Sequence, residues 1–300
     1  MQQTAGQPIQ NFLDFLKFQK RYSQHTIVSY RNDLESFFAF LHQHYGNIDL
    51  IEIKATYIRS WLVELKQHGL ESKSINRKIS TLKSFFKYQL RQELITVSPM
   101  STIISPKISK RLPQFVEKEA ITLLFEHVQF PDDWHGKTQR LLIQLFYNTG
   151  MRQAELVGLK ETHIDKTNNS LKVLGKGSKE RIIPVSDKLM HDVQNYMADK
   201  RKNFAEFDKM FLLVSAGGNK LYPKYVYNTV KKYLSLVTTI DKKSPHVLRH
   251  TFATHLMNGG ANLNAVKELL GHSSLAATQV YTHNTIEKLK DIHKKSHPKA

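Results

Sequence analysis

Residues 244–256 read SPHVLRHTFATHL and combine three histidines with one arginine in a mostly apolar run. At about 100° per residue of an α-helix, His246, Arg249 and His250 share one face, whereas His255 points to the opposite side. Two histidines four residues apart could bind a metal, but a zinc site needs a further ligand, and no cysteine is available. An imidazole beside a guanidinium suits a phosphate instead. We therefore expect no metal here, a phosphate-binding role for His246 and Arg249, and structural roles for His250 and His255.

Two other segments place cations beside glycines. In YNTGMRQAELVGL, Arg152 opens a predicted helix with Glu155 three residues later, a spacing that also fits an ordinary surface ion pair. In GKGSKER, Lys176 lies at the tip of a predicted hairpin, where flanking glycines allow a close approach to another backbone. That tip could be a solvated turn, or it could enter a DNA groove.

The last candidate segment is LGHSSLAATQVYTH. Gly271 is expected to end a helix, His272 follows it directly, and Tyr281 comes nine residues later. Taken alone, His272 fits a hydrogen-bonded turn residue, and Tyr281 fits a half-buried aromatic side chain.

The charge of the chain favours a polyanionic partner. Its 300 residues contain 44 Lys and Arg against 26 Asp and Glu, a net charge of +18. The excess is +7 in residues 1–110 and +11 in residues 111–300, so both halves are basic and a two-sided grip on a DNA duplex is expected. A basic surface that serves only solubility is the alternative.

The same composition excludes several classes of protein. The absence of cysteine excludes disulfides, thiolate zinc sites and a cysteine nucleophile. No apolar run approaches the ~20 residues that cross a bilayer, and the N-terminus has no secretory signal pattern. We expect a cytoplasmic protein without a membrane partner.

The predicted fold is mainly α with a small antiparallel β-sheet. Residues 9–100 show helical periodicity with aromatic residues at core spacing, which indicates a bundle of about four helices. A Pro- and Ser-rich basic stretch then indicates a linker. The expected organisation is a helical DNA-binding domain at 1–104, a linker at 105–113, and a second, mainly α domain at 114–300 with a hairpin at residues 170–185 and a short amphipathic helix in its C-terminal tail.

Exposed cations of the bundle and the hairpin are the expected DNA contacts. They are Arg31, Arg77, Lys78 and Lys83 in the bundle, and Lys172, Lys179 and Arg181 in the hairpin.

Together, the separate segments form an ordered set. The motifs T-G-x-R-x-x-E-L, G-K-G-x-K-x-R, H-x-L-R-H-x-F-A-T-H and LGHSSLAATQVYTH follow one another along the chain. This series resembles the tyrosine recombinase (phage integrase) family, and the resemblance spans both domains, with the bundle matching that family's core-binding domain and residues 114–300 its catalytic domain. The length and the segment GKGSKERIIPV are most similar to the Xer branch.

The resemblance implies a catalytic set that works without metal or cofactor. Tyr281 would be the nucleophile and form a 3′-phosphotyrosine link to DNA. Arg152 and Arg249 would hold the phosphate oxygens, and Lys176 would protonate the 5′-oxygen that leaves. Glu155 would support the site.

His246 and His272 would assist proton transfer in the same set. The implied function is site-specific DNA recombination through a Holliday junction, of the Xer type that resolves chromosome dimers at segregation. The implied partners are a double-stranded recombination site, three further protomers in a homo- or hetero-tetramer that can include a paralogous recombinase, and a DNA translocase activator. A mobile-element integrase, of the integron, transposon or phage type, is the alternative within the family. A non-catalytic DNA-binding regulator is the more remote one.

Overall fold

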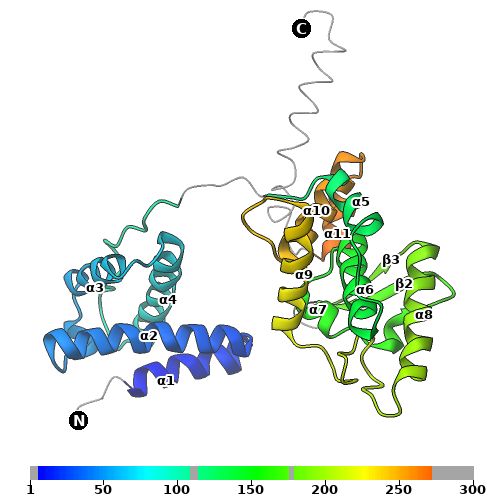
Figure 1. The fold of residues 1–300 in the computed structure, drawn as a ribbon. Helices are drawn as coiled ribbons and strands as arrows, with labels where there is room; N and C mark the ends of the chain where they lie inside the picture. Colours follow the sequence, from blue (N-terminus) through cyan, green and yellow to red (C-terminus); the bar gives the residue numbers. More distant parts are fainter. Residues whose placement is uncertain (1–5, 109–113, 176–178, 272–300) are drawn as a thin grey trace, which may run out of the picture. The chain divides into compact units, whose positions relative to one another are not determined.

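The computed structural model describes residues 6–108, 114–175 and 179–271. The chain divides into two compact units, Met1–Arg111 and Leu112–Ala300 (Figure 1). Each unit has its own hydrophobic core. No helix in the described ranges is both long and apolar enough to cross a membrane.

The first unit is a helical bundle with an aromatic core. Ser23 caps the N-terminus of the long second helix, because its hydroxyl accepts a hydrogen bond from the backbone N–H of Thr26 at 3.3 Å. Phe12, Phe37 and Phe85 are fully buried. The elements are α1 (Gly6–Asp14), a π-helix (Phe15–Gln19), α2 (Gln24–Tyr45), a 3-10 turn (Leu50–Glu52), α3 (Ala55–Gln67) and α4 (Ser72–Arg91).

A buried carboxylate joins α2 to α4. Asp33 on α2 accepts hydrogen bonds from Lys78 at 3.1 Å and from Thr81 at 2.9 Å, and also pairs with Arg77. Lys78 is buried and its ammonium pairs with Asp33, which argues against the predicted contact between Lys78 and DNA. The sequence contained the signal, because Lys78 lies three residues after Ile75 and four before Leu82, on the buried stripe of α4.

The second unit is mainly α with one small sheet. Helix α6 passes through its middle and contacts α8, α9 and α10 (Figure 1). The elements are α5 (Lys118–Glu126), α6 (Trp134–Thr149), α7 (Gln153–Val157), a 3-10 turn (Glu161–His163), β1 (Ile164–Asp165), β2 (Ser170–Leu174), β3 (Glu180–Pro184), α8 (Asp187–Asn203), α9 (Pro223–Val237), α10 (Pro245–Asn258) and α11 (Leu263–Leu270).

The sheet has three antiparallel strands in the order β1-β2-β3. Strands β2 and β3 form the predicted hairpin, in a register that pairs Val173 with Arg181 and Leu171 with Ile183. Strand β1 was not predicted, since two residues are too short to show an alternating pattern. The predicted fold class, mainly α with a small antiparallel sheet, is confirmed.

A buried lysine holds the chain that follows α8. Lys200 is 0% exposed and donates to the carbonyls of Phe211 at 2.8 Å and Leu212 at 3.3 Å. It also pairs with Glu161, a residue of the turn before β1. A buried ammonium is tolerated only when its donors are satisfied, so this contact ties the 204–212 segment to α8 and to the sheet.

Lys200→Met is expected to lower the stability of the second unit by about 3 kcal/mol, because it leaves buried carbonyls without their donor and removes one of the two cations that pair with Glu161. The readout is the urea midpoint followed by Trp134 fluorescence in a Trp61→Phe background, since Trp134 packs on Tyr196 of α8 with ring centroids 4.6 Å apart. Lys202→Met, at an exposed position of the same helix, is the matched control. Equal midpoints for the two variants would contradict the assignment.

Candidate active site

The turn between α6 and α7 places Arg152. Helix α6 ends at Gly150, which has a left-handed backbone with φ of 58°. A Cβ at Gly150 would lie 2.3 Å from the ring of Phe252 on α10, so glycine is required both for the backbone and for the packing. Arg152 follows as the N-terminal cap residue of α7.

Glu155 caps the same turn and is not part of a surface ion pair. Its Oε2 accepts the backbone N–H of Arg152 at 2.7 Å, and its Oε1 accepts the Arg152 guanidinium at 2.8 Å. The side chain of Glu155 is only 4% exposed. A carboxylate this buried requires cationic partners, and the fold supplies more than one.

Arg181 reaches the same carboxylate from β3. Its two terminal nitrogens donate to Oε1 and Oε2 of Glu155 at 3.0 and 2.8 Å, and its Nε donates to the carbonyl of Leu269 at 2.7 Å. These bonds occupy its guanidinium inside the unit, which argues against the predicted contact between Arg181 and DNA. Strand alternation could have revealed this, since Arg181 is two residues from buried Ile183 and thus on the inward face of β3.

Arg249 approaches from α10. It is 5% exposed, and its Nη1 and Nη2 donate to the carbonyls of Gly150 and Leu270, both at 2.6 Å. Its Nη1 lies 4.0 Å from Oε2 of Glu155. The structure therefore brings Arg152 and Arg249, from separate motifs, to one carboxylate, which supports the prediction that they act together.

The charges around Glu155 set its protonation. Burial alone would raise the pKa of this carboxyl, but hydrogen bonds from Arg181 and Arg152 and the positive charge of Arg181 outweigh burial. The pKa of Glu155 therefore lies below its ordinary value, and the side chain is an anion at neutral pH.

The histidines of α10 differ in their surroundings. His246 is exposed in the first turn, one turn before Arg249. His255 lies on another side of the helix, as predicted, and its Nδ1 is 3.1 Å from the hydroxyl of Tyr147. Burial lowers the pKa of His255, which fits a neutral, structural side chain. Within the described ranges, no group of three His, Cys, Asp or Glu side chains is placed to hold a metal.

Three predicted site residues lie outside the described residues. They are Lys176, His272 and Tyr281. The chain is described up to Gly175 on the hairpin and up to Gly271 after α11, so the described residues that precede Lys176 and His272 border the arginine cluster. Gly271 ends α11 with φ of 63°, as predicted.

The other predicted DNA contacts are exposed. In the first unit these are Arg31, Arg77 and Lys83, and in the second Lys172 and Lys179. Arg77 is held by Ser29 at 2.8 Å as well as by Asp33, which directs an exposed guanidinium over α2. Lys172 pairs with Glu180 across the hairpin at 2.7 Å.

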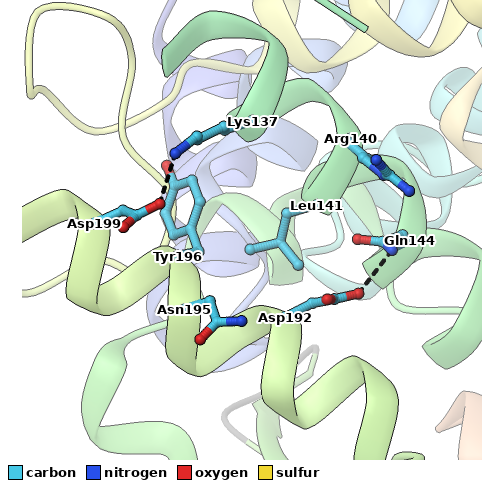
Figure 2. A pocket seen from close by; sticks show the side chains of 8 residues that line it. All are labelled: Lys137, Arg140, Leu141, Gln144, Asp192, Asn195, Tyr196 and Asp199. Carbon is cyan, nitrogen blue, oxygen red and sulfur yellow. Dashed lines mark hydrogen bonds and ion pairs between the residues drawn. The ribbon is translucent and has the colours of Figure 1, made fainter. Parts of the chain in front are cut away.

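A hollow of about 250 Å³ between α6 and α8 is separate from the predicted site (Figure 2). Two of its polar pairs bond each other: Lys137 donates to Asp199 at 2.6 Å, and Gln144 donates to Asp192 at 2.9 Å. None of the predicted catalytic residues lines it.

Comparison with known proteins extends over nearly the whole chain. Residues 114–288 match the model of the phage integrase family, and residues 9–93 match that of the phage integrase N-terminal SAM-like domain. The tyrosine recombinase XerC of Staphylococcus saprophyticus is 40% identical over 295 residues, covering 97% of both chains. That of Chlorobaculum parvum is 34% identical over 319 residues, covering 97% of this chain and 94% of the relative.

Solved structures share the fold. XerH bound to a palindromic difH substrate in a post-cleavage complex has a TM-score of 0.76 at 22% identity, covering 96% of this chain and 83% of the other. The Tn1549 transposon integrase with transposon right end DNA has a TM-score of 0.75 at 21% identity, covering 98% and 99%.

The chain belongs to the phage integrase family. The predicted enzyme class, a site-specific tyrosine recombinase of the Xer type, is confirmed by the relatives named tyrosine recombinase XerC at 34–40% identity. The alternative of a non-catalytic DNA-binding regulator is not supported by these relatives.

Glu155→Gln tests the electrostatic role of the carboxylate. The pKa of Glu155 is near 4.5 in the unfolded chain and lower in the folded protein. The charge of Glu155 therefore stabilises the folded state above pH 4.5, and this stabilisation is lost as the pH falls from 4.5 toward the folded pKa. At neutral pH, we expect the variant to lose about 3 kcal/mol, since three arginines then lack their anion.

The readout is the gap in urea midpoint between wild type and Glu155→Gln, followed by Trp134 fluorescence in the Trp61→Phe background. This gap should be constant around neutral pH and should shrink below about pH 4.5. A gap that does not change with pH would contradict the role of the charge.

Proposed function

We propose that this chain cuts and rejoins a specific DNA site through a covalent 3′-phosphotyrosine intermediate made by Tyr281. The observation that carries the proposal is the convergence of Arg152 and Arg249 on buried Glu155. Two guanidiniums fixed beside one another form a site for an anion whose charge grows during the reaction, such as the phosphorane of a phosphodiester transfer.

The proposed reaction conserves the number of phosphoester bonds. The phenol of Tyr281 passes its proton to His246 or His272 as its oxygen attacks the scissile phosphorus, the bond from phosphorus to the 5′-oxygen breaks, and the 5′-hydroxyl leaves with a proton from Lys176. A 5′-hydroxyl of the partner duplex then attacks the phosphotyrosine, which restores the phenol and joins the strands. The first exchange yields a Holliday junction, and the second resolves it. Because the bond is retained at each step, neither ATP nor a metal is needed.

The remaining site residues assist this chemistry. A phenol has an ordinary pKa near 10, so its attack at neutral pH requires the positive surroundings that Arg152 and Arg249 provide. His246, which is exposed one turn before Arg249, is proposed to hydrogen-bond the phosphate. His272, which directly follows Gly271, is proposed to assist proton transfer. Glu155 does not contact DNA in this scheme, but keeps the arginines in place.

The helical bundle is proposed as the DNA core-binding domain, at residues 1–104, joined by a linker at 105–113 to the catalytic domain at 114–300. The exposed cations Arg31, Arg77 and Lys83 on α2 and α4 support this division, as does the net charge of +7 in residues 1–110. On the hairpin of the catalytic domain, Lys172 and Lys179 are proposed as further phosphate contacts.

The assembly and biological role are also proposed. We assign the enzyme to Xer-type resolution of chromosome dimers in the cytoplasm at segregation. It would act on a double-stranded recombination site as a homo- or hetero-tetramer, with a paralogous recombinase as the second subunit in the latter case and a DNA translocase as the activator. The tail after Tyr281, with apolar Ile286, Leu289 and Ile292 at helical spacing, would dock on a neighbouring protomer.

Tyr281→Phe is expected to abolish covalent attachment to DNA and to leave DNA affinity unchanged, because only the nucleophilic oxygen is removed. Genomic fragments that stay attached to the wild-type protein after SDS treatment are sequenced to locate the site. A duplex of that site, nicked beside the scissile phosphate so that the leaving strand diffuses away, then traps the adduct for quantification on a gel.

Tyr222→Phe, at an exposed tyrosine, is the matched control and should form adduct at the wild-type rate. Adduct formation should also persist in excess chelator. An adduct in Tyr281→Phe, or none in the wild-type protein, would refute the proposed function.

Lys83→Ala is expected to weaken DNA binding through one lost phosphate contact. The slope of log K against log salt concentration should become shallower by about 0.9, the value for one counterion. Lys66→Ala, at an exposed position on α3, should leave the slope unchanged. Equal slopes for Lys83→Ala and wild type would remove Lys83 from the interface.

A further inference from the structure

The C-terminal turn of α11 is held by three arginines from three other elements. The carbonyls of Leu269, Leu270 and Gly271 accept hydrogen bonds at 2.7, 2.6 and 3.3 Å. The donors are, in that order, Arg181 of β3, Arg249 of α10 and Arg152 at the start of α7. A helix end leaves its last carbonyls unsatisfied and carries partial negative charge, so guanidiniums suit this position.

Arg181 joins this turn to the carboxylate beneath it. Its two terminal nitrogens donate to both oxygens of Glu155, while its Nε donates to the carbonyl of Leu269. Its side chain is 11% exposed, against 33% for Arg152, so Arg181 belongs to the interior of the cluster and Arg152 to its open side.

Arg181 also lies close to two glycines that precede proposed site residues. A Cβ placed on Gly271 would lie 3.2 Å from Cδ of Arg181. One placed on Gly175 would lie 3.6 Å from Oε1 of Glu155 and 3.7 Å from Nη1 of Arg181. The side chain thus contacts the residue before Lys176 and the residue before His272, in addition to the partner of Arg152.

We propose that Arg181 is a positioning residue for strand cleavage, which fixes Glu155 and the end of α11 so that Arg152 and the chains leading to Lys176 and His272 are aligned on one phosphate. This inference rests on the proposed function. It places Arg181 away from the DNA, and its effect is transmitted through Glu155 and Leu269.

The geometry requires an arginine. Three donors in one plane reach two carboxylate oxygens and a backbone carbonyl in a single conformation. A lysine could keep the positive charge and one hydrogen bond, but not the bidentate fork. Without Arg181, the described cations left beside Glu155 would be Arg152 at the start of α7 and Arg249 on α10, and the carboxyl would be protonated more easily.

The test uses Arg181→Met and Arg181→Lys in the full chain, on the nicked duplex that traps the wild-type adduct. Both variants should keep the wild-type Kd for DNA and lose about tenfold to a hundredfold in single-turnover cleavage at saturating protein, as is common when a supporting residue is lost. In Arg181→Met, the acidic limb of the cleavage profile should also move to higher pH, because Glu155 then takes up a proton earlier. Arg181→Lys should fold as the wild type does, which excludes unfolding as the cause.

The matched controls are Arg201→Met and Arg201→Lys. Arg201 likewise bonds a carboxylate, Glu161, and a carbonyl, that of Met197 at 2.7 Å, but it lies on α8 outside the cluster. Both control variants should cleave at the wild-type rate.

Three results would overturn the proposal. Wild-type cleavage at saturation with a weaker Kd would make Arg181 a DNA contact. Wild-type cleavage with an unchanged Kd would leave it without a role. Slower cleavage with an unmoved acidic limb in Arg181→Met would exclude an effect through Glu155. If the wild-type protein itself forms no Tyr281-dependent adduct, the proposed function fails instead, and the two failures are thereby distinguished.

Discussion

The arginine cluster of the second unit depends on the buried carboxylate of Glu155. It is almost fully buried, and it bonds Arg152 and Arg181 while Arg249 lies 4.0 Å away. Three guanidiniums this close together would repel one another without an anion between them. Glu155 thus lets the fold keep a concentrated positive charge at one place, and a bound phosphate would add a second anion to a cluster that is already assembled.

Backbone geometry limits where these side chains can be. Gly150 allows α6 to end against Phe252 of α10, and its carbonyl receives Arg249 from that same helix. The end of α6, the start of α7 and the face of α10 are therefore fixed relative to one another before any ligand binds. The last turn of α11 completes this frame through its carbonyls. Such prior fixing is what electrostatic stabilisation of a transition state requires, because no reorganisation is then needed during the reaction.

The sequence predicted the elements better than it predicted the partners of each side chain. Helical spacing indicated the bundle, and Gly271 indicated a helix end, because these signals are local. The contacts of Lys78 and Arg181 within the fold were not predicted, because a cation in a basic protein was taken for a DNA contact. Both lie on buried faces of their elements, and only the fold reveals the carboxylates, Asp33 and Glu155, that bind them.

The most direct test of this account is a structure of the protein covalently trapped on the nicked duplex. We expect Tyr281 to carry the 3′-phosphate, with guanidinium nitrogens of Arg152 and Arg249 within hydrogen-bond distance of the phosphate oxygens. We also expect Arg181 to bridge Glu155 and Leu269 still, without touching DNA. A phosphate bound elsewhere, or an Arg181 that leaves Glu155 to contact the DNA, would contradict it.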